Sequence, residues 1–110
     1  MLREKNTIKS LIDKFPNLEF KKADGVFDHK YAVDFNVFRN SSLICGIQVK
    51  PKSYLYNMSY VLKAKSANKA KNKKYQKEYD VNVIDIISSQ SGEIYNKECL
   101  KAINAAIDLV

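Results

Sequence analysis

Residues 31–50 decide the fold, and they read YAVDFNVFRNSSLICGIQVK. Two runs rich in β-branched and aromatic residues stand on either side of a polar loop, residues 40–42, which is the pattern of a β-hairpin. Because the side chains of a strand alternate between its two faces, the length of the loop sets which residues meet. A loop formed by residues 40–42 places Asp34 directly opposite Gln48.

This register gives the hairpin one polar and one apolar face. The polar face carries Asp34, Asn36, Gln48 and Lys50. The apolar face carries Val33, Phe35, Val37, Cys45, Ile47 and Val49. Charged groups in apolar surroundings need each other, a metal or a ligand. An ion pair between Asp34 and Lys50 at a strand end would meet that need, and so would a bound divalent cation.

The same residues have the chemistry of a divalent-metal phosphodiester site. Hard cations such as Mg²⁺ prefer oxygen ligands, and the candidates are the Asp34 carboxylate, the Gln48 side-chain carbonyl and the Val49 backbone carbonyl. The Lys50 ammonium is suited to orient or deprotonate an attacking water, or to stabilise charge that builds up on phosphorus.

Outward from the hairpin, apolar spacing and breaker residues predict the other elements. Ile8, Leu11, Ile12 and Phe15 form a helical stripe that Pro16 ends, and projecting the stripe back one turn reaches Glu4. The remaining expectations are a strand over 18–21, a turn at 23–25, a basic helix over 54–79, a strand over 81–87, a loop over 88–92 and a helix over 94–109. The order α, β, β, β, α, β, α predicts one α/β domain over residues 1–110 with a mixed sheet.

Composition excludes several classes of protein. The chain has 110 residues, of which 45% are hydrophobic, so one core is expected. No run approaches the roughly 20 apolar residues of a membrane span, and the first ten residues lack the apolar core of a signal peptide. Cys45 and Cys99 suit neither a disulfide framework nor a zinc site. We expect a cytoplasmic domain that uses no organic cofactor, since the phosphate-binding glycine motifs are absent.

Positive charge is concentrated in one part of the chain. The net charge is +7, and the segment from Phe35 to Lys77 has ten basic residues and no Asp or Glu. Such segregation is typical of a polyanion-binding surface, nucleic acid above all, although a lysine-rich helix can also be merely a solvated face. The candidate nucleic-acid contacts are Lys52, Lys63, Lys65, Lys69, Lys71, Lys73, Lys74 and Lys77.

The hairpin resembles the PD-(D/E)xK nuclease superfamily. Val33-Asp34 stands where that motif has Pro-Asp, and Gln48-Val49-Lys50 stands where it has (Asp/Glu)-x-Lys. Over residues 31–60, the strings VDFNVF and LICGIQVKPKSY are similar to MjaI-type restriction endonucleases.

The resemblance implies a restriction-endonuclease-like core and a Mg²⁺-dependent endonuclease, usually a homodimer, that cuts double-stranded DNA. It makes Asp34 the metal-binding carboxylate, puts Gln48 in the place of the second acid and makes Lys50 the catalytic lysine. Such folds often add a glutamate from the preceding helix, for which Glu4 is the first candidate and Glu19 the second.

Two other functions remain open. One is a non-catalytic nucleic-acid-binding domain, degenerate or truncated, that binds through the lysine-rich helix. The other is a repair or junction-resolving nuclease on the same fold. The chain is also short for a sequence-specific endonuclease, so we expect either a minimal form or a fragment of a longer enzyme.

Overall fold

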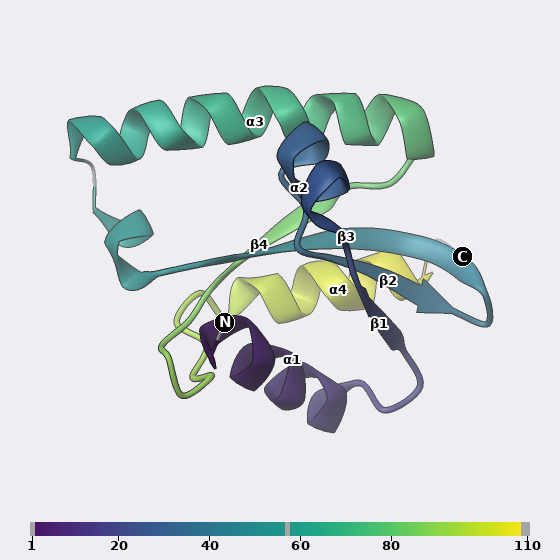
Figure 1. The fold of residues 1–110 in the computed structure, drawn as a ribbon. Helices are drawn as coiled ribbons and strands as arrows, with labels where there is room; N and C mark the ends of the chain where they lie inside the picture. The colour runs from purple at the N-terminus through teal and green to yellow at the C-terminus, as the bar shows by residue number, and fades with distance from the viewer. Residues whose placement is uncertain (1, 57, 109–110) are drawn as a thin grey trace.

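A mixed four-stranded sheet lies at the centre of the structure, a computed structural model that describes residues 2–56 and 58–108 (Figure 1). Its strands are β1 (Glu19–Lys22), β2 (Phe35–Arg39), β3 (Ser42–Lys50) and β4 (Val83–Ile87), in the spatial order β1-β2-β3-β4. The first three strands are antiparallel neighbours, whereas β4 runs parallel to β3. The expected α/β class with a mixed sheet is confirmed.

Helices cover both faces of this sheet (Figure 1). They are α1 (Leu2–Lys14), α2 (Gly25–Tyr31), the 3₁₀ helix η1 (Lys52–Leu55), α3 (Ser59–Tyr79) and α4 (Glu98–Asp108). α1 and α4 lie on one face, and α2 and α3 lie on the other. Within the described part of the chain, no helix is long and apolar enough to cross a membrane.

The short helix α2 replaces the turn expected at residues 23–25. The Asp24 carboxylate accepts a hydrogen bond from the Phe27 backbone N–H at 2.8 Å, which caps the helix, and Gly25 is its first residue. The helix runs on to Tyr31, so the strand expected to start there begins only at Phe35. The dipeptide that signals a turn therefore starts a helix instead.

The hairpin reaches the expected register by a different route. The turn has two residues, not three: Arg39 pairs with Ser42, and the φ angles of Asn40 and Ser41 are 50° and 69°. Positive φ at both central positions is the geometry of a turn whose twist matches paired strands. A β-bulge at the Val37/Phe38 step then shifts the pairing by one residue, so that from this step on the register is the expected one.

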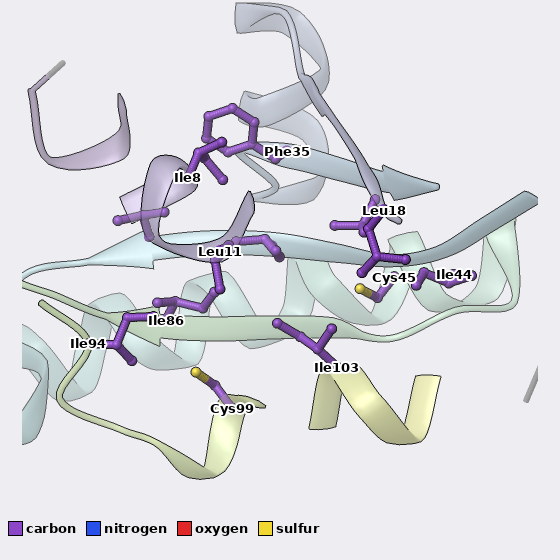
Figure 2. Close-up of a cluster of buried hydrophobic side chains, with 13 residues drawn as sticks. Ile8, Leu11, Leu18, Phe35, Ile44, Cys45, Ile86, Ile94, Cys99 and Ile103 are labelled. Carbon is purple, nitrogen blue, oxygen red and sulfur yellow. The ribbon is translucent and has the colours of Figure 1, made fainter. Parts of the chain in front are cut away.

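The apolar face of the sheet packs against α1 and α4. Figure 2 shows this core, in which Leu11 of α1 and Ile103 of α4 lie on the same side of the sheet as Ile86 of β4. The expected apolar residues Phe35, Val37, Cys45, Ile47 and Val49 all belong to this cluster. Val33 does not, because it precedes the strand; it packs instead with Tyr31 and Tyr75 on the α3 face.

Two expected helices are shorter than their sequence patterns. α3 begins at Ser59, after Pro51 and η1, and Asn57 of the expected helix lies outside the described residues. α4 begins at Glu98 because Ile94 pairs with Ser88, and Asn96 holds the preceding segment against β4. The Asn96 side chain donates to the Asp85 carbonyl at 2.7 Å and accepts from the Ile87 N–H at 2.8 Å. Leu109, the expected last residue of that helix, is outside the described residues.

Candidate functional site

A row of polar residues crosses three strands on the face covered by α3. Phe35 pairs with Ile47, so Asp34, one residue earlier, lies at the level of Gln48. Gln48 in turn pairs with Asp85 of β4. Since neighbouring strands lie about 4.8 Å apart, a carboxyl, an amide and a second carboxyl stand side by side. We refer to Asp34, Gln48 and Asp85 as the polar row.

Asp34 is fixed immediately before the first residue of β2, where the chain enters the sheet. It is 6% exposed, and its Oδ2 accepts a hydrogen bond from the Val49 backbone N–H at 2.7 Å. Its own N–H donates to the Ile47 carbonyl at 2.8 Å, and its carbonyl accepts from the Ala23 N–H at 2.9 Å. The carboxylate thus takes the place of a backbone acceptor beside β3, which holds it in one position.

The electrostatics of Asp34 favour a carboxyl that binds a proton or a cation. Burial raises its pKa to about 6, and a hydrogen bond to the Asp28 carboxyl adds to the rise. The Val49 amide and the Lys22 ammonium act in the opposite direction. Asp28, on α2, is therefore a direct neighbour of the site that the sequence interpretation missed.

Gln48 carries a buried acceptor for which the described part of the chain offers no partner. The residue is 5% exposed, and among the described residues its Oε1 makes no hydrogen bond. An unsatisfied buried acceptor costs about 1–3 kcal/mol, so an acceptor of this kind marks a place where a ligand would be stabilising. It lies between two carboxyl groups, where a donor or a cation would be held.

The oxygen atoms at this point suit Mg²⁺. Among the described residues no group of three or more His, Cys, Asp and Glu is arranged to hold a metal, so neutral oxygens have to contribute. The N–H and C=O of a strand residue point to the same side of the strand, so the Val49 carbonyl points toward β2, as its amide does. Carboxylate, amide and backbone oxygens are the donors that hard cations prefer, and the residues therefore fit the ion.

Lys50 lies on the same face, two residues after Gln48. Its Nζ is 5.0 Å from the centre of the Tyr54 ring, and the Lys65 Nζ of α3 is 5.9 Å from the same ring. Although Asp85 is exposed at the edge strand, partial desolvation of its carboxyl raises its pKa, while Lys50 and Lys65 lower this pKa and Asp34 raises it further. Asp85 therefore lies within electrostatic reach of both lysines and of Asp34.

The structure places the two candidate glutamates differently. Glu4, on α1, makes an ion pair with Lys22 at 2.6 Å. Burial lowers the pKa of Lys22, but Glu4, Asp34 and Asp28 together raise it, so Lys22 stands between Glu4 and Asp34. Glu19 is exposed at the far end of β1, opposite Phe38, where it pairs with Lys21 at 3.3 Å. The structure does not bring Glu19 to the polar row.

The lysines of α3 divide into two groups. The buried side of the helix faces the sheet and carries Val61, Asn68, Asn72 and Tyr75, with Lys65 among them. On the opposite side, exposed to solvent, lie Lys63, Lys73, Lys74 and Lys77, which we call the outer lysines. Lys69 and Lys71 flank the two sides. Lys52 lies apart in η1, with its Nζ 5.6 Å from the Tyr95 ring centre.

Asp85 was missed at the sequence level although a signal was present. It is the one charged residue in the apolar run Val83–Ile87, so it stands out within its strand. Its neighbours depend on the parallel pairing of β4 with β3, which the alternation pattern cannot set. Comparison with family models, curated proteins and solved structures finds no match to the chain.

Proposed function

We propose that this chain is a metal-dependent nuclease that hydrolyses phosphodiester bonds in double-stranded DNA, with a core of the PD-(D/E)xK type. The observation that carries the proposal is the pairing of a buried, hydrogen-bonded Asp34 with a buried Gln48 whose Oε1 has no partner among the described residues. Gln48 and Lys50 lie at the end of β3, and Asp34 lies at the level of Gln48 just before β2, in the order that the motif resemblance requires.

Each residue has a separate role in this proposal. Asp34, Gln48 and the Val49 carbonyl would hold Mg²⁺, which when bound supplies stabilisation of negative charge on the phosphate. Lys50 would place its ammonium where it can hold a water molecule or offset charge on the phosphate oxygens. Glu4 would not hold the ion itself; its ion pair with Lys22 would position Lys22 next to Asp34.

Cleavage of plasmid DNA tests this function. The purified protein is incubated with plasmid in Mg²⁺, in Mn²⁺ and in EDTA, beside Asp34→Asn and Lys50→Ala. We expect metal-dependent cleavage by the wild type and none by either variant, while both retain the far-UV spectrum of the folded protein. Asp13→Asn, which changes an exposed carboxylate of α1, serves as the control and should cleave normally. Cleavage that persists unchanged in Asp34→Asn would exclude this site.

One observation favours a second function, that of a non-catalytic nucleic-acid-binding domain. The outer lysines lie on the side of α3 that faces away from the polar row, so a nucleic acid bound there would not need the row. In that case binding is strongly salt-dependent and survives Asp34→Asn, and no cleavage accompanies it. Comparing linear with branched DNA in the same assay separates a restriction-like enzyme from a junction-resolving one.

A further inference from the structure

The cation site of the proposed nuclease has a charge deficit at Gln48. Among its ligands only Asp34 is ionisable, and the affinity of a site for a hard cation follows the number of charged ligands. Where the motif has a second acid, this chain has a neutral amide. A site with one carboxylate would hold Mg²⁺ weakly unless another residue supplies the missing charge.

Asp85 is placed to supply it. It pairs with Gln48 in the parallel register of β3 and β4, so the two side chains leave the same face of the sheet about 4.8 Å apart. The backbone of Asp85 is held in place by Asn96, which donates to its carbonyl at 2.7 Å. The residue is exposed and borders a groove of about 820 Å³ along the outer edge of β4, which gives solvent ions a route to it.

Among the described residues, the Asp85 carboxylate has no partner of its own. The ion pairs of 4.0 Å or less within residues 2–56 and 58–108 join Lys21 to Glu19 and Lys22 to Glu4, so Asp85 makes none. Its side chain also makes no hydrogen bond to any described residue, although Lys50 and Lys65 are near enough to influence it. The carboxylate is therefore available to an added cation.

The unpartnered Oε1 of Gln48 is the independent observation that points to a ligand. This atom is buried and belongs to the middle residue of the polar row, and the described residues offer it no donor. A cation in contact with the row would satisfy it and offset the repulsion between Asp34 and Asp85. The missing negative charge at Gln48, the pairing of Gln48 with Asp85 and the unpartnered Oε1 all concern the same point of the sheet.

We propose that Asp85 provides the second negative charge of the divalent-cation site, one strand away from the position where the motif carries it. The polar row is then the cation site, with its amide in the middle and a carboxylate at each end. This inference rests on the proposed function only for the identity of the ion, and it predicts cation binding in the absence of DNA.

Binding of Mn²⁺ to the full chain, without DNA, tests the inference. The binding is measured by titration calorimetry and by the electron paramagnetic resonance signal of free Mn²⁺. We expect Asp85→Asn to weaken Mn²⁺ binding about tenfold or more, as loss of a carboxylate in or next to a metal site does. Asp85→Glu keeps the charge and should bind within a few-fold of the wild type. Asp13→Asn, with the same loss of charge on α1, should bind as the wild type does.

The decisive variant moves the charge back to β3. In Asp85→Asn combined with Gln48→Glu, Mn²⁺ affinity should return to within a few-fold of the wild type, because the two positions substitute for each other. Unchanged binding in Asp85→Asn would overturn the inference. Loss of binding that Gln48→Glu does not rescue would overturn it too, since Asp85 would then act only as a counter-charge to Lys50 and Lys65.

The plasmid assay keeps this inference separate from the proposed function. If Asp85→Asn loses Mn²⁺ and the double variant recovers it, but the wild type never cleaves DNA, the cation site stands and the nuclease fails. If the wild type cleaves and Asp85→Asn binds Mn²⁺ normally, the nuclease stands and the role of Asp85 fails. A wild type that binds no divalent cation would overturn both.

Discussion

The Asp34 carboxyl makes the stability of the metal-free protein depend on pH. Burial and the contact with Asp28 raise its pKa from 3.8 to about 6 in the folded state. The folded protein therefore holds the proton more tightly than the unfolded chain, and this adds stability below pH 4. The contribution is lost as the pH rises from about 4 to about 6, and it stays lost above that.

Urea unfolding in EDTA between pH 3.5 and pH 7.5 measures the effect. Over that range we expect the free energy of unfolding of the wild type to fall by about 2–3 kcal/mol relative to Asp34→Asn. The asparagine cannot titrate, yet its Oδ1 can still accept from the Val49 N–H. Two curves that remain parallel across the range would show that the Asp34 pKa is not raised.

Gly46 is the point where β3 and α3 come closest. A Cβ at this position would lie 3.1 Å from two carbons of the Tyr75 ring, whose hydroxyl donates to the Asn36 side chain at 2.8 Å. Gly46→Ala should therefore push the ring away and cost about 1–3 kcal/mol of stability in urea unfolding. Gly25→Ala is the matched control, because nothing lies within 4 Å of its Cβ, and it should not destabilise. Equal stability of the two variants would contradict the close packing of β3 on α3.

At the scale of elements, the cap of α2 controls the surroundings of the site. The helix has only seven residues, and the Asp24 carboxylate satisfies the Phe27 N–H at its start. Asp24→Ala should cost about 1 kcal/mol, whereas Asp24→Asn, which keeps a capping oxygen, should cost much less. Thermal or urea unfolding of both variants measures this difference. If alanine and asparagine behave alike, the cap does not hold the helix that carries Asp28.

α2 also shows where sequence reasoning stops. Its start looks like a turn, and its length falls below what local propensity can stabilise. It forms because Phe27 and Tyr31 pack with Tyr75 and Tyr79 of α3, with ring centres 5.6–6.1 Å apart. These contacts join segments more than forty residues apart, and no local pattern contains them. Asp28 lies next to Asp34 because it is on α2, so its place in the site depends on the same long-range packing.

The hairpin could be predicted because alternation is a local property. Asp34, Gln48 and Lys50 share the polar face as long as Asp34 lies opposite Gln48. The two-residue turn alone would shift this pairing by one residue, and the β-bulge at the Val37/Phe38 step shifts it back. Asp85 could not be placed next to Gln48, since the parallel pairing of β4 is set by the crossover through α3 and by packing on both faces. The sequence therefore predicts two of the three residues of the polar row, Asp34 and Gln48, and tertiary structure adds Asp85.

At the scale of the whole molecule, charge and site lie in different layers. Asp34 and Gln48 of the polar row are buried on the face of the sheet that α3 covers, and Asp85 is exposed at the edge strand, whereas the outer lysines project from the other side of that helix. α1 and α4 cover the opposite face of the sheet (Figure 1). A polyanion attracted by the +7 charge therefore meets α3 first.

Removal of outer lysines should weaken DNA binding without damaging the fold. Lys73, Lys74 and Lys77 are exposed, and glutamine has nearly the same helix propensity as lysine, so the triple glutamine variant keeps α3. Each phosphate contact adds about 0.9 to the slope of log affinity against log salt concentration, so the slope should fall by about 1–3. The control replaces Lys14, Lys97 and Lys101, which lie exposed on the opposite face, and it removes the same charge. Fluorescence anisotropy with duplex DNA, from about 50 to about 300 mM salt, measures the affinity of both triple variants. If both variants lose the same amount of affinity, net charge and not the α3 surface attracts the DNA.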